Sequence, residues 1–252
     1  MKALKMVKYQ IMNITPTIMV FYAIFVAVIG GLAALNRASD GSIHSSGLEM
    51  ATVIFLLVNG LNSFKTSFRF SQANHVSRKS FFQGIILAIF PITLAMSVID
   101  LAINRVYNLY VPSPTNFDMI YGTYRDTGLG DLSEIGAAIW TQANDFATLF
   151  GTMAWQFAVY SLFFMLGILI SLIYYRCNKV MKVVVSFSPF IFLWLLRGMP
   201  PRTWDAIGDF IASAFGWHSR NPYMAILTFT ILGAAAAACI YLLVRRAVVK
   251  EP

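Results

Sequence analysis

KTSFRFSQANHVSRK, residues 65–79, is a short and strongly basic stretch between two apolar runs, 51–64 and 81–102. It contains four cations, one histidine and no acid, namely Lys65, Arg69, Arg78, Lys79 and His75. Serine, asparagine and phenylalanine alternate with the charges, a composition that favours a short helix lying along a surface over a flexible tether. We therefore predict that this stretch faces the cytosol and contacts a partner.

The composition of the whole chain is that of a membrane protein. Of its 252 residues, 58% are apolar and only 12% are charged, with a mean hydropathy of +0.67. An ordinary soluble domain has about 25% charged residues, whereas an apolar run of about 20 residues crosses a bilayer core. The sequence therefore predicts an all-α membrane protein with a single transmembrane domain over residues 1–252. Its six expected transmembrane spans are 14–35, 48–64, 81–102, 146–175, 183–196 and 224–244.

The net charge of +8 is distributed unevenly between the connections of these spans. With both termini in the cytosol, the inner segments hold 13 of the 19 basic residues and a single acid, Glu251. The outer segments and outer helix ends hold the other 6 basic residues and 10 acids. Such a bias orients a polytopic protein with its positive segments inside and attracts anionic lipid of the inner leaflet. The basic charge therefore indicates membrane lipid as a partner and requires no nucleic acid.

The N-terminal apolar run is expected to be a membrane span. Its length, 14–35, exceeds the roughly 7–15 residues of a signal-peptide core, and no small-residue cleavage site follows it. Residues 1–13 place Leu4, Val7 and Ile11 at spacings of three and four, which predicts an N-terminal interfacial helix. The alternative is that these residues are only the basic start of the first span.

A second amphipathic helix is expected at 203–215, between the fifth and sixth spans. Its apolar face carries Trp204, Ile207, Ile211 and Phe215, and its polar face carries Asp205, Asp209 and Ser213. Thr203 is a suitable N-cap for this helix. A helix so polar on one side does not cross lipid, so we predict that it lies along the outer membrane surface.

Polar residues inside the expected spans are candidates for contacts within the membrane. Asn59 and Asn62, in the second span, are expected to hydrogen-bond a neighbouring helix. Asp100 lies near the outer end of the third span, and an acid in such a position is a candidate transport-path residue. The alternative for Asp100 is a simple ion pair with Arg105.

Sequence motifs for catalysis or nucleotide binding are missing. The chain has no Gly-Lys dipeptide, and therefore no phosphate-binding P-loop, and it has no His-Glu pair, no Gly-x-Ser-x-Gly and no Cys-x-x-Cys. Its histidines and cysteines are isolated: His44, His75, His218, Cys177 and Cys239. We therefore expect no enzyme activity, no cofactor, no metal site and no disulfide. A membrane enzyme would need clustered catalytic residues, and an ion-coupled carrier would need paired buried acids and an internal repeat.

In these features the chain resembles the permease subunits of ABC-2 type transporters, particularly the compact Gram-positive bacterial type. The shared features are an N-terminal interfacial helix, six spans with both ends inside, a basic inner loop between the second and third spans, and an outer interfacial helix between the fifth and sixth. Related small permeases carry an Asn-Gly-Val-Ser-Arg-Lys-like stretch in that inner loop, where this chain has Asn-His-Val-Ser-Arg-Lys at 74–79. His75 at the glycine position departs from this pattern.

The resemblance implies a multi-pass protein of the bacterial cytoplasmic membrane that performs no chemistry itself. A separate ABC ATPase subunit would push on a cytosolic coupling helix in 65–79, and a second permease subunit would complete a homodimer or related heterodimer. The residues expected to bind the ATPase are Phe68, Phe70, Asn74, His75, Val76, Ser77, Arg78 and Lys79. The apolar, uncharged spans favour export or clearance of an amphiphilic substrate such as a peptide or lipid. A non-transporting polytopic scaffold or sensor is the alternative function.

Overall fold

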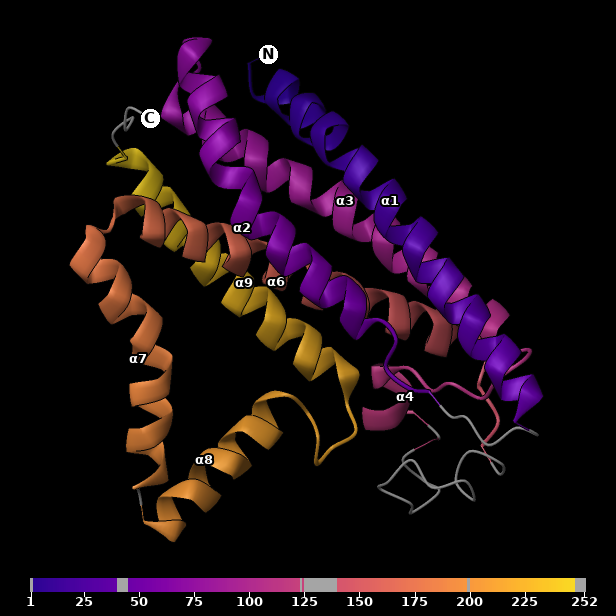
Figure 1. The fold of residues 1–252 in the computed structure, drawn as a ribbon. Coiled ribbons are helices and arrows are strands. Elements are labelled where there is room, and N and C mark those ends of the chain that lie inside the picture. The colour runs from indigo at the N-terminus through magenta and orange to yellow at the C-terminus, as the bar shows by residue number, and fades with distance from the viewer. Residues whose placement is uncertain (1, 40–44, 123, 125–139, 199, 248–252) are drawn as a thin grey trace.

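The structure is a computed structural model that describes residues 2–39, 45–122, 124, 140–198 and 200–247. Throughout these residues the chain forms helices and no strand (Figure 1). The helices are α1 (Lys2–Ala38), α2 (Met50–Ala73), α3 (Arg78–Tyr107), α4 (Asn116–Ile120), α6 (Phe146–Arg176), α7 (Lys179–Arg197), α8 (Pro201–Ala214) and α9 (Pro222–Arg245). The predicted all-α fold is confirmed.

Five of the described helices, α1, α3, α6, α7 and α9, are long and apolar enough to cross a membrane. This number of apolar helices supports a multi-pass membrane protein. α2 covers the expected second span but is not among the five, because Asn59, Asn62 and Lys65 interrupt its apolar character. The second expected span, 48–64, therefore stays a prediction, and so does the total of six spans.

α1 is one continuous helix of 37 residues that includes both the expected interfacial helix and the first span. Residues 2–13 form the first turns of α1 and are continuous with the first span, so their interfacial position stays a prediction. Pro16 lies inside the helix and removes one backbone hydrogen bond, a loss that membrane helices tolerate when neighbouring groups compensate for it. The first turns are held against α3, where Met6 is buried beside Gly84.

The basic stretch 65–79 does not form a helix of its own. Residues 65–73 are the last turns of α2, and α3 begins at Arg78. The prediction of a separate cytosolic coupling helix is therefore wrong for this chain. What replaces it is a helix–turn–helix end, in which the connection 74–77 reverses the chain.

This connection is a Schellman turn, in which two amides beyond a helix end bond back to its last carbonyls. The amide of Val76 donates to the carbonyl of Ser71 at 2.9 Å, and the amide of His75 donates to that of Gln72 at 3.1 Å. His75 has a φ of +52°, in the left-handed region. These two bonds satisfy carbonyls in the last turn of α2, and α3 begins at Arg78. The four residues between the helices are too few for an intervening helix.

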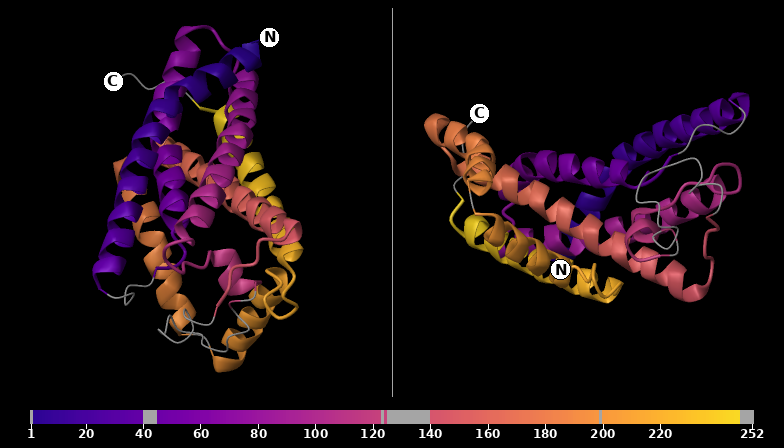
Figure 2. Two further views of the ribbon diagram at one scale, coloured as in Figure 1. Left: turned by 90° about the vertical axis from the view of Figure 1, so that its right-hand side faces the viewer. Right: turned by 90° about the horizontal axis from the view of Figure 1, so that it is seen from below.

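α6 is the central helix and packs against α2, α3 and α9 (Figures 1 and 2). Its closest crossing is with α2, where Gly60 faces Gly167. A Cβ atom on Gly60 would lie 2.4 Å from the carbonyl oxygen of Phe164, and one on Gly167 would lie 2.2 Å from that of Leu57. Glycine at both positions lets the two backbones approach, as small residues do in membrane helix pairs.

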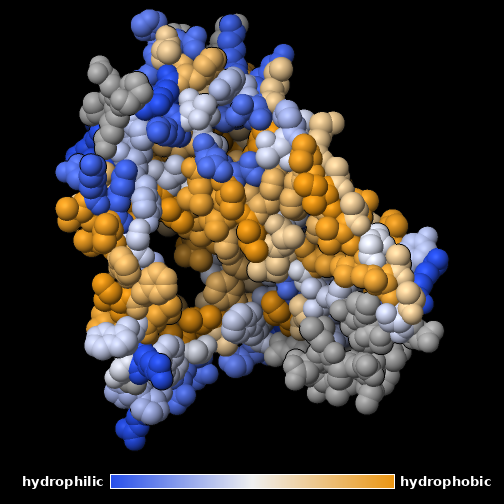
Figure 3. All heavy atoms as spheres, viewed as in Figure 1, coloured by the Kyte–Doolittle hydropathy of each residue, from blue (hydrophilic) through white to orange (hydrophobic). Residues whose placement is uncertain are grey.

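α7 stands apart from this bundle. None of its residues is buried, and Figure 3 shows its apolar surface separated from the body of the molecule by an opening. Its exposed side chains include Phe187, Phe190 and Trp194. An apolar helix exposed on all sides suits a lipid surrounding.

α8 confirms the predicted amphipathic helix between the fifth and sixth spans. It begins at Pro201, so Thr203 lies inside the first turn and is not the N-cap. Its last turn packs on the bundle, where Ala212 is buried and the carbonyl of Ala214 accepts the hydroxyl of Thr228 of α9 at 2.5 Å. Its position along a membrane surface stays a prediction.

Several helix ends gather at each end of the bundle. The start of α1, the end of α9 and the α2–α3 turn lie at the same end (Figure 1), where Figure 3 shows a largely hydrophilic surface. α4 and the connection from α7 to α8 lie at the opposite end (Figure 1). The orientation of these ends relative to the cytosol stays a prediction.

Candidate functional site

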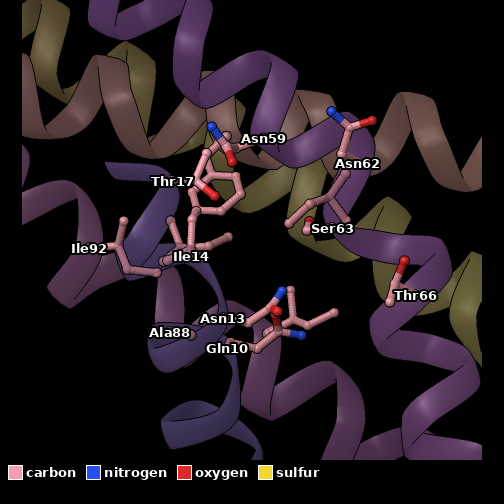
Figure 4. A pocket seen from close by; sticks show the side chains of 14 residues that line it. Gln10, Asn13, Ile14, Thr17, Asn59, Asn62, Ser63, Thr66, Ala88 and Ile92 are labelled. Atoms are coloured by element: carbon pink, nitrogen blue, oxygen red, sulfur yellow. The ribbon is translucent and has the colours of Figure 1, made fainter. Parts of the chain in front are cut away.

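A cavity of about 380 Å³ lies between α1 and α2, and residues of α3 and α6 complete its lining (Figure 4). One wall is polar and consists of Gln10, Asn13, Thr17, Asn59, Asn62, Ser63 and Thr66. The rest of the lining is apolar and consists of Ile14, which lies on α1 between Asn13 and Thr17, and of Ile85, Ala88, Ile89, Ile92, Phe164 and Ile168. The cavity is the candidate functional site, because hydrogen-bonding side chains of two helices face one open space inside the bundle.

Helical periodicity builds the polar wall. On α1 the polar residues are spaced by three and four, and on α2 by three, one and three. Residues at these spacings share one helix face. α1 packs mainly on α3 and contacts α2 much less, so the polar face of α2 stays uncovered and borders the cavity.

Part of the hydrogen-bonding capacity of this wall is used within the chain. Ser67 donates to Gln10 Oε1 at 3.2 Å and joins α2 to α1 beside the cavity. Asn59 donates to the carbonyl of Phe55 on its own helix at 2.9 Å, so the prediction that it bonds a neighbouring helix is wrong. Gln10 is 7% exposed, and its Nε2 has no hydrogen-bond partner among the residues that the structure describes. The wall therefore keeps donors and acceptors that water or a ligand can use.

The two walls suit a molecule with a polar part and an apolar part. Among the described residues, no charged side chain lines the cavity, and an unpaired charge is costly in such surroundings. The chemistry of the cavity therefore favours a ligand without net charge, whose polar groups face α1 and α2.

The two phenylalanines predicted to bind a partner lie in different surroundings. Phe68 is fully buried and packs edge-to-face on Phe81 of α3 and Tyr175 of α6, with ring centroids 5.3 and 6.0 Å apart. It therefore holds α2, α3 and α6 together. Phe70 is 44% exposed and stacks on Tyr9 of α1 at 4.3 Å.

The next four predicted residues form the turn. Asn74 and His75 are exposed, whereas Val76 is half-buried and packs against the core. Asn74 donates to the carbonyl of Phe70 at 2.8 Å. Ser77 caps α3, and its hydroxyl accepts a backbone amide of the first turn at 3.2 Å. These residues have clear structural tasks, whether or not a partner binds them.

Arg78 and Lys79 are both exposed at the start of α3. Arg78 Nη1 donates to the carbonyl of Arg245 in the last turn of α9 at 2.9 Å. Free carbonyls and the negative end of the helix dipole attract a cation at this position. Arg78 thus links the α2–α3 turn to α9.

Asp100 is buried between α1, α3 and α6, at 4% exposure. Its Oδ1 accepts the hydroxyl of Tyr22 at 2.8 Å, and its Oδ2 accepts the hydroxyl of Tyr160 at 2.5 Å. Asp100 and Arg105 both belong to the described chain, and no ion pair joins them, so that alternative is wrong. Asp100 does not line the cavity.

Sequence reasoning missed most of the cavity. It singled out Asn59 and Asn62, but as contacts between helices, and it did not consider Gln10, Asn13 or Thr17. Their spacing by three and four was a usable signal. An interfacial helix at 1–13 would place Gln10 and Asn13 at the membrane surface, where polar side chains need no other explanation, and Thr17 alone lies in the expected first span.

Fold and cavity define an all-helical protein with several membrane-length helices and a polar site inside the bundle. Comparison with family models, with curated proteins and with solved structures finds no match. Across the described ranges, no group of three or more His, Cys, Asp or Glu residues could hold a metal ion, and Cys177 and Cys239 are free thiols. The function must therefore be inferred from the chemistry of the site.

Proposed function

We propose that this chain is the membrane-spanning permease subunit of an ATP-driven ABC transporter in the bacterial cytoplasmic membrane. It would export or clear an amphiphilic substrate such as a peptide or lipid. A separate ABC ATPase subunit would supply the energy, and a second permease subunit would complete a homodimer or related heterodimer. The observation that carries this proposal is the two-walled cavity within a bundle of membrane-length helices.

The volume of the cavity limits what it can hold. Ligand pockets typically measure about 300–1,000 Å³, so about 380 Å³ suits a headgroup or a side chain rather than a whole lipid. The substrate would place its polar part against α1 and α2 and its apolar part against α3 and α6. Longer chains would extend between the helices into the bilayer.

α2 supplies a mechanical connection between the proposed ATPase surface and the cavity. Phe70 lies near the exposed end of α2, while Ser63 and Thr66 of the same unbroken helix line the cavity. Free energy from ATP binding must reach the spans through packed contacts with two arrangements. An ATPase that displaces the α2–α3 turn would therefore move the polar wall with it.

The coupling surface is tested by comparing Phe70→Ala with Arg78→Ala. The chain is purified with its ATPase from membranes, and association and amphiphile-stimulated ATP hydrolysis are measured. An aromatic anchor is worth about 2 kcal/mol or more at an interface, and an exposed charge about 0–1 kcal/mol. Phe70→Ala should therefore weaken association far more than Arg78→Ala does.

Two control variants sharpen this comparison. Tyr9→Ala removes the ring stacked on Phe70 but leaves Phe70 itself, and Phe187→Ala removes an exposed ring on α7. Both should retain the ATPase. If Phe70→Ala and Arg78→Ala also leave association and hydrolysis unchanged, the coupling assignment fails. Absence of any ATPase would instead favour the alternative, a non-transporting scaffold or sensor.

The cavity is tested by photo-crosslinking in nanodiscs with a diazirine-labelled lysophosphatidylcholine, a probe without net charge. Labelled peptides should come from α1 and α2. The double variant Asn62→Leu/Thr66→Val should lower labelling several-fold, whereas Thr230→Val on the exposed face of α9 should not. Equal labelling of both variants would remove the cavity as the substrate site.

A further inference from the structure

A stripe of buried polar residues runs along α3 beyond the cavity. Thr93, Ser97, Asp100 and Asn104 are spaced by four, three and four, so they share one helix face. Each is at most 6% exposed. The stripe begins next to Ile92, which lines the cavity, and runs toward the end that holds α4. Polar groups on a membrane-length helix are costly and mark functional positions.

The neutral members of the stripe all have hydrogen-bond partners. Thr93 and Ser161 of α6 share a hydrogen bond of 2.9 Å between their hydroxyl oxygens, and Ser97 donates to a carbonyl of its own helix at 2.8 Å. Asn104 donates to the carbonyl of Ser113 at 3.0 Å and accepts from Gln142 at 2.9 Å. Asp100 is the ionisable member, and the others extend from it toward both ends.

The hydrogen bonds around Asp100 can serve either protonation state of its carboxyl group. Tyr22 has one hydroxyl proton but two acceptors within reach, Asp100 Oδ1 at 2.8 Å and the carbonyl of Met96 at 3.2 Å. When the carboxyl is charged, Tyr22 donates to Oδ1 and Tyr160 donates to Oδ2. When Oδ1 carries a proton, it donates to the oxygen of Tyr22, and Tyr22 donates to Met96 instead.

We propose that Asp100, with Tyr22 and Tyr160, is a proton-binding site inside the membrane bundle, on the buried polar stripe of α3. One proton is taken up at Oδ1, no other bond changes, and the hydroxyl of Tyr22 rotates from Asp100 to Met96. The second acceptor is what distinguishes this site from a carboxylate that is only structural. This inference rests on the stripe and not on the proposed transport function.

The titratable and charged groups around the site come from several elements. Tyr22 belongs to α1, Tyr160 to α6, and Arg105 to the next turns of α3. Glu49 lies at the start of α2, and the charge of Asp100 adds to the burial that raises the pKa of Glu49. Any test must therefore distinguish protonation of Asp100 from protonation of Glu49.

Infrared difference spectroscopy of the full chain in nanodiscs makes this separation. The carboxyl C=O band of a protonated acid is recorded between acid and alkaline pH, with and without ¹³C-labelled aspartate. We expect one aspartate band from a buried carboxyl that disappears in Asp100→Asn. The band should persist in Glu49→Gln and in Asp118→Asn, which alters the other buried aspartate of the described residues, at 2% exposure.

Tyr22→Phe covers the case in which Asp100→Asn does not fold. This variant keeps the carboxyl group but removes one of the two hydroxyls that donate to its charged form. The pH at which the band reaches half its intensity should therefore rise by about one unit. An aspartate band that survives in folded Asp100→Asn, or that Tyr22→Phe leaves unchanged, overturns the proposal. So does a band that responds to sodium against choline chloride at constant pH, since the ligand would then be a metal cation.

Discussion

His75 occupies a backbone conformation that favours glycine. At a φ of +52°, a residue with a Cβ atom is disfavoured by roughly 1–2 kcal/mol, whereas glycine adopts this conformation freely. We therefore expect His75→Gly to keep the Schellman turn and to raise the free energy of unfolding by about 1 kcal/mol. Denaturation in detergent, followed by circular dichroism, measures the change.

Asn74→Gly is the matched control for this prediction. Asn74 has a φ of −94° and donates its side-chain amide to Phe70, so glycine gains nothing there and the hydrogen bond is lost. This variant should lower stability. If the two glycine variants behave alike, the left-handed conformation of His75 does not limit the stability of the turn.

Glu49 is expected to make stability depend on pH. It precedes α2, outside the five membrane-length helices, is 4% exposed and accepts the amide of Asn116 at 2.5 Å. Burial raises its pKa from 4.5 to about 7, and the charges of Asp100 and Asp118 add to this shift. The folded chain therefore binds this proton more tightly than the unfolded chain does.

The sign of the effect follows from that difference in proton binding. The contribution of Glu49 to the free energy of unfolding is fully present below pH 4.5 and is lost as the pH rises through about 7. The melting temperature should therefore fall across this window, and Glu49→Gln, which resembles the protonated form, should flatten the profile. A Glu49→Gln profile as steep as that of the wild type would assign the pH dependence to other groups.

At the scale of elements, the crossing of α2 and α6 sets the arrangement of the bundle. Gly167→Ala would place a methyl group 2.2 Å from the carbonyl oxygen of Leu57, so the helices would have to separate. Overpacking of this kind costs about 1–3 kcal/mol. We expect a corresponding loss of stability in thermal melting.

Gly208→Ala is the control for the crossing. Gly208 lies in α8, where no atom of the described residues comes within 4 Å of an added Cβ atom, and alanine is favoured over glycine in a helix by roughly 0.5–1 kcal/mol. This variant should be unchanged or more stable. Equal losses in both variants would mean that the α2–α6 crossing is not the source of the effect.

At the scale of the whole molecule, the charge distribution predicts the orientation in the membrane. The segments expected inside carry 13 of the 19 basic residues, and such segments stay in the cytosol. In a chain without Cys177 and Cys239, Ser219→Cys should react with an impermeant thiol reagent on intact cells. Ala73→Cys, at the opposite end of the bundle, should react only after permeabilisation. Labelling of Ala73→Cys on intact cells would mean that the predicted orientation is inverted.

The sequence alone determined the class of the fold and the places of several helices. α3, α6 and α9 cover the spans expected at 81–102, 146–175 and 224–244, and α8 covers most of the amphipathic segment. These features could be predicted because the length and periodicity of an apolar run are local properties that membrane and helix geometry translate directly into structure. The residue types of Asn59, Asn62 and Asp100 also marked them as unusual in such helices.

Only the tertiary structure decided what those residues contact. Asp100 meets Tyr22 and Tyr160, which lie 78 and 60 residues away in the chain, and the cavity combines faces of four helices. The basic stretch failed as a separate helix because a single left-handed residue, His75, ended α2 and allowed α3 to start at once. Such contacts depend on the distance between two helices and on the position along each helix at which they cross. Close approaches such as that of Gly60 to Gly167 set both. Two glycines far apart in a sequence leave no periodic pattern, so their meeting is visible only in the packed structure.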